Sequence, residues 1–277
     1  MSQQTEFKKY HLLGVEIDAV TMPQAIDYIA SLAADSEAPA GYITKPYVEF
    51  LDLAYRNQPV AALLNGSRLT IPDGVALNWA AYYLYGGPCT IWRWLYTLAQ
   101  IVLSPAAIRR ILPERAAGTN FTWPLLERCQ IDKLTVFLIG SPQGHGIDQT
   151  AAVIQARLPD LSIVGHFSGR FSPTAEEALV AKLRSCQPDV IMVGMGFPRQ
   201  EQLMARLARQ LPHGVLIGEG GTFDYRSFGG NRPKAPRPLQ IVGLEWLWRL
   251  LLEPQRIRRQ LAIPRFIWRV WREGKKG

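Results

Sequence analysis

The dipeptide Asp73-Gly74 stands directly after a short apolar run, residues 69–72. Open α/β sheets bind their ligands beyond the carboxyl ends of the strands, where a carboxylate can act as a general base. An aspartate in this position also serves as the N-cap of a following helix, and the residues alone favour that structural role.

A second candidate site is the segment 194–201, which reads Gly-Met-Gly-Phe-Pro-Arg-Gln-Glu after a strand-like run. Gly194 and Gly196 allow a ligand to approach the backbone closely, and the proline suits the first turn of a helix. Gln200 and Glu201 then lie at the amino-terminal end of that helix, which is more polar chemistry than packing requires. Packing alone is the alternative explanation.

The turn at 140–146, Gly-Ser-Pro-Gln-Gly-His-Gly, also follows a strand and opens a helix. Such a turn can bind phosphate through backbone N–H groups and the positive end of the helix dipole. However, its spacing differs from G-x-G-x-x-G, and no acidic residue ends the next strand to bind a ribose. A phosphate site and a plain tight turn are both open.

The sequence predicts no metal site, because it contains no Asp-x-Asp motif and its four histidines lack the spacing of metal ligands. Any diphosphate would therefore be held by arginine, amide and helix-dipole contacts. Three widely separated cysteines argue against a disulfide scaffold and for a reducing compartment.

The pattern of apolar residues predicts the elements that position these groups. Short apolar runs alternate with helical segments of 10–15 residues, which is typical of βαβ units and a parallel sheet. We expect strands at 12–18, 41–44, 69–73, 134–140, 161–164, 190–193 and 215–218. One helix is expected to begin after Thr21, its N-cap, and a second at residue 75. A third follows the turn at 140–146 and ends at residue 158, and two more are expected at 173–185 and 198–210.

The net charge of +8 is concentrated in one segment of the 277-residue chain. Residues 226–277 contain 13 Lys or Arg and 3 Asp or Glu, together with four of the eight tryptophans. The preceding 225 residues carry a net charge of −2. We therefore divide the chain into an α/β domain, 1–225, and a basic amphipathic appendage, 226–277, with helices expected at 239–252 and 254–271, the second broken at Pro264.

No stretch is long and apolar enough to predict a membrane-spanning helix, and the first residues lack the apolar core of a signal peptide. The nearest candidate is the run of 15 uncharged residues between Arg93 and Arg109, which suits a buried or interfacial helix. This pattern favours a cytosolic protein that associates with a membrane surface.

Taken together, these motifs resemble those of the WecG/TagA/CpsF family of bacterial glycosyltransferases. The resemblance covers nearly the whole chain and is carried by Leu13-Gly-Val-Glu-Ile-Asp, Pro72-Asp-Gly, Glu114-Arg-Ala-Ala-Gly, Gly194-x-Gly-x-Pro-x-Gln-Glu, Gly218-x-Gly-Gly-x-Phe-Asp and Gly243-Leu-Glu-Trp-Leu-Trp-Arg. It implies a Rossmann-like parallel sheet with helices on both faces, and a C-terminal appendage that associates with the membrane.

The resemblance also implies a metal-independent, inverting transfer of N-acetylmannosamine or a related hexose. The expected partners are a UDP-sugar donor, a polyprenyl-diphosphate-linked acceptor and the anionic inner face of the bacterial cell membrane. The pathway would be the assembly of cell-surface polysaccharide or a teichoic-acid-type polymer, with no cofactor and no nucleic acid. The oligomeric state is open, a homo-oligomer included.

Several site residues are carried over by motif. Asp73 matches the family's proposed catalytic base, and Arg115 matches the arginine that stabilises the leaving diphosphate. The expected substrate-binding residues are Thr44, Gly74, Gly194, Gly196, Gln200, Glu201, Asp224, Arg256 and Arg259. The last two are placed to face the lipid diphosphate or to close over UDP.

Two departures from the family pattern stand out. Family members usually carry an asparagine shortly after the threonine, whereas here the run is Thr44-Lys-Pro-Tyr, which leaves the donor sugar open. Residues 83–112 also form extra apolar material between Asp73 and Arg115. A membrane or lipid-acceptor contact is favoured over an extra packed hairpin, because so much apolar surface requires burial.

Two other classes of protein are weaker alternatives. A nicotinamide-dependent oxidoreductase on a similar sheet is disfavoured by the missing G-x-G-x-x-G and ribose-binding acid. A nucleic-acid-binding protein acting through the basic tail is disfavoured because that tail has far more aliphatic surface than base stacking uses.

Overall fold

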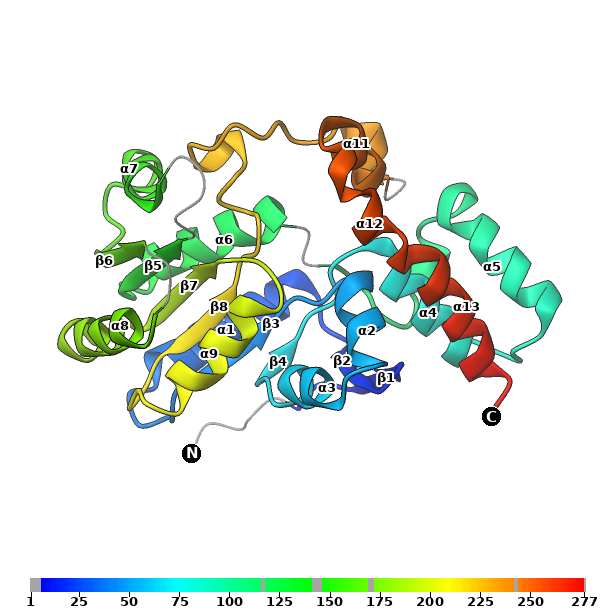
Figure 1. The fold of residues 1–277 in the computed structure, drawn as a ribbon, viewed down its shortest axis with the longest axis horizontal. Helices are drawn as coiled ribbons and strands as arrows, with labels where there is room; N and C mark the ends of the chain where they lie inside the picture. The colour runs from blue at the N-terminus through cyan, green and yellow to red at the C-terminus, as the bar shows by residue number, and fades with distance from the viewer. Residues whose placement is uncertain (1–5, 116–117, 141–145, 169–171, 242–243, 277) are drawn as a thin grey trace.

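The computed structural model describes residues 6–115, 118–140, 146–168, 172–241 and 244–276. At its centre lies a six-stranded parallel sheet with the strand order β4-β3-β8-β7-β5-β6 (Figure 1). The strands are β3 (Gly41–Thr44), β4 (Leu69–Thr70), β5 (Val136–Gly140), β6 (Ile163–Ser168), β7 (Val190–Gly194) and β8 (Val215–Gly218). The predicted α/β class with a parallel sheet is therefore confirmed, although β6 lies further along the chain than expected.

Helices cover both faces of this sheet, because its strands are apolar on both sides. Leu138 of β5 packs in one core with α1 (Met22–Ala34), α6 (Gly118–Ile131) and α7 (Ile147–Arg157). Its neighbours Phe137 and Ile139 point the other way, into a core with α8 (Pro173–Cys186) and α9 (Arg199–Ala208). The alternation of side chains along a strand thus produces two separate cores.

The amino-terminal region differs from the prediction of one strand over 12–18. It forms an antiparallel hairpin of β1 (Lys9–Leu12) and β2 (Val15–Asp18), in which Leu12 pairs with Val15. The two turn residues, Leu13 and Gly14, have φ angles of 52° and 85°. This is the two-residue turn whose twist matches a hairpin, and the leucine in it gives no turn signal in the sequence. The N-cap predicted at Thr21 is confirmed, and with Gln24 it forms a capping box at the start of α1.

A third core lies beside the sheet and includes the end of the chain. It brings the β1–β2 hairpin together with α2 (Val48–Ala54), α3 (Gln58–Asn65), α4 (Val75–Tyr85) and α13 (Ala262–Gly274). Phe266 and Val270 of α13 are completely buried in it. The last helix of the basic segment is therefore an integral part of the folded body, as Figure 1 shows in red.

Ion pairs hold α13 against α2. The buried carboxylate of Asp52 lies 3.1 Å from Nη2 of Arg265 and 2.7 Å from Nη2 of Arg56. Arg269, which is 8% exposed, donates to the Asp52 carbonyl at 2.9 Å and also pairs with its carboxylate. Part of the basic charge of residues 226–277 is thus used inside the protein.

Between Asp224 and α13 the chain forms a series of short helices. They are η2 (Arg226–Phe228), α10 (Arg237–Ile241), α11 (Glu245–Leu252), η3 (Pro254–Arg256) and α12 (Ile257–Gln260). The expected break at Pro264 lies instead at Leu261, between α12 and α13. Pro264 falls in the first turn of α13, where its missing N–H costs no helical hydrogen bond.

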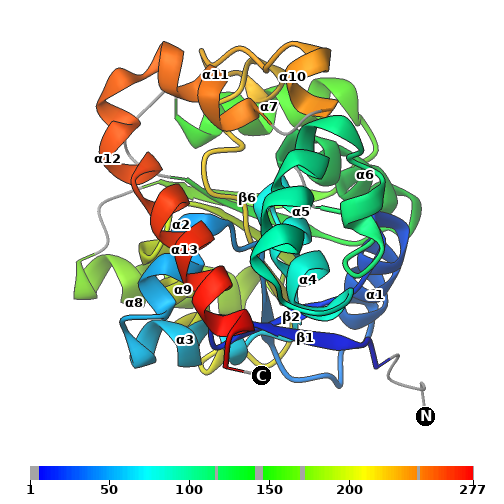
Figure 2. The same cartoon turned by 90° about the vertical axis from the view of Figure 1, so that its right-hand side faces the viewer.

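The apolar segment 83–112 contains the helix α5 (Ile91–Leu103) and the short turn η1 (Ala107–Arg109). In Figure 2, α5 and α13 lie side by side on the face toward the viewer, and the rings of Trp94 and Trp271 are 6.4 Å apart. Within the described residues, no helix is both long enough and apolar enough to cross a membrane.

Candidate active site

The loops that follow β3, β4, β7 and β8 meet at the carboxyl edge of the sheet. Asp73 lies in the loop after β4, where its backbone N–H donates to the carbonyl of Pro46 at 2.9 Å. Gly74 has a φ of 104° and is itself the N-cap of α4, with no side-chain cap. The capping role that the residues alone favoured for Asp73 is therefore wrong, and its carboxylate is available for other contacts.

The pKa of the Asp73 carboxyl group is higher in the protein than in water. Burial raises its pKa to about 6, and Glu245 acts in the same direction. The positive charges of Arg249, Lys45 and Arg115 oppose this rise. A half-buried carboxylate with a pKa near neutrality, in the field of three cations, is well suited to accept a proton beside an anionic group.

Lys45 forms a buried ion pair that the sequence reasoning missed. Its Nζ lies 3.0 Å from Oε1 of Glu219, and both side chains are almost completely buried. Glu219 also accepts a hydrogen bond from the Thr122 hydroxyl at 2.6 Å. Lys45 directly follows β3 and Glu219 directly follows β8, so their position after two neighbouring strands was the available signal.

Four arginines, Arg115, Arg232, Arg249 and Arg256, form what we call the arginine cluster above this edge. Arg115 donates to the carbonyl of Gln240 and lies 3.8 Å from Glu245. Arg249, on α11, donates from Nε to the Tyr225 hydroxyl at 2.8 Å.

The other two members share one acid. Arg232 lies 3.1 Å from Asp224 and 2.9 Å from Glu253, and Arg256 lies 2.7 Å from the same Glu253. Burial lowers the pKa of Arg256, and so do the neighbouring charges of Arg232, Arg249 and Arg259, while Glu253 opposes the shift. Each of these positive charges destabilises the charged form of its neighbours. A bound anion would relieve this repulsion, so the cluster is a strong site for one.

Gln200 and Glu201 lie beneath the loops and are 3% and 0% exposed. The Gln200 carbonyl oxygen accepts from the backbone N–H groups of Met195, Gly196 and Gly220, at 3.4, 3.1 and 2.9 Å. Its amide nitrogen donates to Glu201 at 2.7 Å. Because the oxygen and the nitrogen of the Gln200 carboxamide both bond to the protein, their geometry favours a role in shaping the two glycine loops over the substrate contact expected from the sequence.

Glu201 is a second carboxylic acid with a raised pKa. Burial raises its pKa to about 7, against hydrogen bonds from Gln200 and the backbone that favour the charged form. Its Oε2 has no hydrogen-bond partner among the described residues. Glu201 is therefore a completely buried acid that contacts the loops of the site through Gln200.

The remaining expected residues are placed as follows. Thr44 is completely buried and its hydroxyl donates to Ser67 at 3.3 Å, so it faces the protein interior. Gly194 makes room for Phe223, whose ring lies 2.4 Å from where a Cβ would stand, whereas Gly196 has a φ of 76° and open space around it. Asp224 is half-exposed and pairs with Arg232. Arg259 is 54% exposed and lies 3.8 Å from Glu49, and its charge also acts on Arg256 of the arginine cluster.

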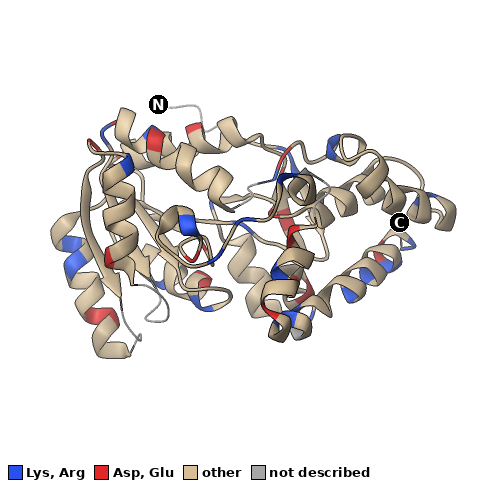
Figure 3. Ribbon diagram, turned by 90° about the horizontal axis from the view of Figure 1, so that it is seen from above, with Lys and Arg blue, Asp and Glu red and all other residues tan. Residues whose placement is uncertain are grey.

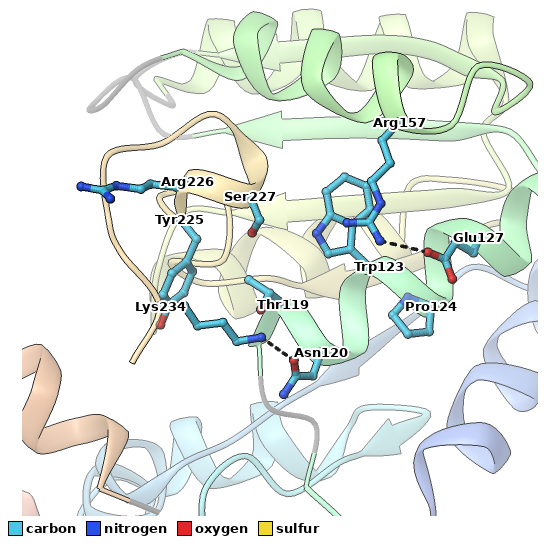
Figure 4. A pocket seen from close by; sticks show the side chains of 10 residues that line it. All are labelled: Thr119, Asn120, Trp123, Pro124, Glu127, Arg157, Tyr225, Arg226, Ser227 and Lys234. Carbon is cyan, nitrogen blue, oxygen red and sulfur yellow. Dashed lines mark hydrogen bonds and ion pairs between the residues drawn. The ribbon is translucent and has the colours of Figure 1, made fainter. Parts of the chain in front are cut away.

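A pocket of about 400 Å³ lies next to this edge (Figure 4). Its walls come from α6, from Arg157 of α7 and from the segment 225–234. Figure 4 shows the Trp123 ring with Arg157 beside it, 4.1 Å from the ring centroid. Phe228 stacks on the same ring at 4.5 Å, so neither face is free for a nucleotide base. Tyr225 lines the pocket and also binds Arg249, so it joins the pocket to the arginine cluster.

The predicted turn at 140–146 lies for the most part outside the described residues. Among the residues that the structure does describe, no three His, Cys, Asp or Glu side chains are grouped to hold a metal ion.

The carboxyl edge of this parallel α/β sheet thus brings together a carboxylate, a buried Lys–Glu pair and an arginine cluster, an arrangement suited to binding an anionic ligand. The sequence matches the model of the Glycosyl transferase WecG/TagA/CpsF family over residues 10–93 and 98–277. The chain belongs to this family of glycosyltransferases. Residues 94–97, which lie within α5, are outside the matched ranges.

Proposed function

We propose that the protein is an inverting, metal-independent glycosyltransferase that uses a UDP-sugar as donor and a polyprenyl-diphosphate-linked sugar as acceptor. The donor sugar would be N-acetylmannosamine or a related hexose. One observation carries the proposal: at the carboxyl edge of the sheet, the half-buried carboxylate of Asp73 is within electrostatic reach of Arg249, Lys45 and Arg115.

In the proposed reaction, the acceptor hydroxyl attacks the anomeric carbon while Asp73 takes its proton. A bond forms between the acceptor oxygen and this carbon, and the bond from the same carbon to the diphosphate breaks. UDP leaves with the negative charge that develops. A single displacement of this kind inverts the configuration of the sugar.

The arginine cluster supplies the positive charge that the leaving diphosphate needs. Guanidinium groups bind phosphate oxygens through paired hydrogen bonds and replace the cation of metal-dependent enzymes in this scheme. In the proposed reaction, Arg115 and Arg249 bind the leaving diphosphate directly. Both lie close enough to Asp73 to affect its pKa. Asp224 and Glu253 orient Arg232 and Arg256, and Gln200 keeps the loops at Gly196 and Gly220 in place.

We further propose that the enzyme works at the inner face of the bacterial cell membrane. The exposed side of α13 carries Trp268 and Arg272, and the exposed Lys275 follows directly after it at helical spacing. Figure 3 shows basic residues along this helix, which ends at the C-terminus. Each Lys or Arg near an anionic surface contributes about 1 kcal/mol to binding.

A screen of UDP-sugars with a short-chain polyprenyl-diphosphate-linked acceptor tests the reaction. We expect one donor to release UDP only when acceptor is present, with a product heavier by one sugar residue. Titration with UDP and NADH in parallel should give binding for UDP alone. Absence of UDP release with every donor and acceptor, from protein that is folded, would reject the proposal.

A further inference from the structure

The helix α5 exposes an apolar side, unlike an ordinary helix on the surface of a soluble protein. Its exposed positions recur at helical spacing and carry no charge: Ile91, Trp92, Leu95, Tyr96, Ala99, Val102 and Leu103. Trp92 is 78% exposed and Leu103 is 81% exposed. An ordinary amphipathic surface helix turns its apolar side inward.

The inward side of α5 is partly polar. Thr97 is completely buried, and its hydroxyl accepts a hydrogen bond from Nε1 of Trp79 on α4 at 3.1 Å. Gln100 is also buried. Trp94, Leu98 and Ile101 also pack inward, against the third core. The protein therefore covers one side of α5, while a second set of large apolar side chains faces outward together, which marks an interaction surface.

The charges around this apolar face are positive. Residues 74–113 contain Arg93, Arg109 and Arg110 and no acidic residue. Arg109 and Arg110 are exposed beyond the carboxyl end of α5. At the other end, Gly274 of α13 approaches Cys89, just before α5, so that the exposed Lys275 and Lys276 lie near it.

The one acid on this part of α13 is directed inward. Glu273 is half-buried and accepts from the backbone N–H of Leu13 at 3.2 Å. Figure 3 shows this end of the molecule largely in tan with scattered blue. An apolar stripe between cationic groups complements an anionic lipid surface, whose headgroups pair with the cations while its hydrocarbon takes up the stripe.

We propose that α5 inserts its apolar face into an anionic membrane and lies in the plane of the bilayer interface. Thirteen residues span about 20 Å, which is shorter than the roughly 30 Å of a bilayer core. Trp92 and Tyr96 are residue types that favour the headgroup region. A second copy of the chain is a poorer occupant, because a symmetric dimer would bring the same cations together.

Insertion of α5 would fix the height of the candidate active site above the lipid. The helix packs on α4, which begins directly after Asp73-Gly74. The two are joined by the buried Trp79–Thr97 hydrogen bond. A carboxylate at the start of a helix held in this way would keep a constant distance from the lipid and could meet a substrate group displayed at the membrane surface.

Vesicle co-sedimentation of the full chain tests this proposal. The double variant Trp92→Glu/Leu103→Glu changes two exposed side chains, and Ile131→Glu, at the end of α6 and 73% exposed in the parent, is the matched control. With phosphatidylcholine–phosphatidylglycerol vesicles, we expect the double variant to bind about tenfold or more weakly and the control to bind as the parent does. Far-UV circular dichroism and the melting temperature should be unchanged in both.

A second measurement locates the helix. Lipids brominated on their acyl chains should quench part of the parent fluorescence, and Trp92→Phe should remove that part. Equal vesicle binding by parent and double variant would overturn the proposal, as would a parent dimer without vesicles that the double variant dissociates. The assay needs neither donor nor acceptor, so vesicle binding through α5 without sugar transfer would count against the proposed function alone.

Discussion

Replacement of Asp73 by asparagine isolates the proton transfer in the proposed reaction. The amide has nearly the same size, so the backbone hydrogen bond to Pro46 and the turn at Gly74 should be preserved. It cannot take a proton from the acceptor hydroxyl. General-base catalysis contributes about 10²–10⁴-fold to a rate, so sugar transfer should fall by a factor in that range while UDP binding stays close to that of the parent.

The pKa of Asp73 also predicts how activity depends on pH. With a pKa of about 6, about one tenth of the carboxylate is ionised at pH 5 and about nine tenths at pH 7. Because only the ionised form accepts a proton, kcat/KM should rise about tenfold over this interval and then level off. The asparagine variant should lack this rise.

Two neighbouring charges should move the pH profile in opposite directions. Arg249 lowers the pKa of Asp73, so Arg249→Gln should shift the rise to higher pH, in addition to any loss of rate. Glu245 raises that pKa, so Glu245→Gln should shift the rise to lower pH. Shifts of the same sign in both variants would show that the electrostatic account is wrong.

The assay is UDP release with the donor and acceptor found in the screen, measured from pH 5 to pH 8. Asp160→Asn is the matched control, since Asp160 is an exposed aspartate just before β6, at the opposite edge of the sheet. The control should have the parent rate and profile. An Asp73→Asn enzyme that keeps the parent rate, or keeps the rise near pH 6, would refute the role of Asp73 as base.

Three further predictions concern stability and metal. Asp52→Asn leaves the buried guanidinium of Arg269 without its counter-charge and should lower the free energy of unfolding by about 3 kcal/mol or more, measured in urea; a change within error would contradict the ion-pair account. The proton on Glu201 is held with a pKa of about 7 in the folded chain against 4.5 in a free side chain, so the parent loses stability as pH rises through this window. Glu201→Gln should therefore be more stable than the parent at pH 8, by an amount on the order of 3 kcal/mol, and equal to it near pH 4, which melting curves at both values would check. Treatment with EDTA should leave sugar transfer unchanged, and a loss restored by a divalent cation would argue for a metal in the reaction.

For the motif at 194–201, the sequence predicted the position in the fold but not the contacts of Gln200. Its glycines and its Gln-Glu pair correctly marked a loop at the carboxyl end of a strand, because strand, turn and helix are local patterns. The sequence pointed to substrate contacts for Gln200, whereas the folded chain surrounds its carboxamide with backbone N–H groups from two loops. One of those loops lies 20 residues further along the chain, so no local pattern contained this information.

For the basic C-terminal segment, the sequence predicted the composition but not the packing of its last helix. Its charge and tryptophans were evident from composition, and they suggested an appendage. In the structure, Arg269 pairs with Asp52, and Phe266 is buried beside Trp79. These contacts join positions about 200 residues apart, and only the packing of α13 onto α2 and α4 determines them.

By itself, the sequence determined the alternation of strands and helices, the capping of α1 and the family, because each depends on residue type and short spacing. Tertiary structure alone decided that the charges of Lys45, Arg115 and Arg249 act on Asp73, since these residues come from four segments that meet only when the chain folds. It also decided the outward orientation of the apolar side of α5. A helical pattern records which residues share a face, but only the neighbouring elements determine whether that face is covered.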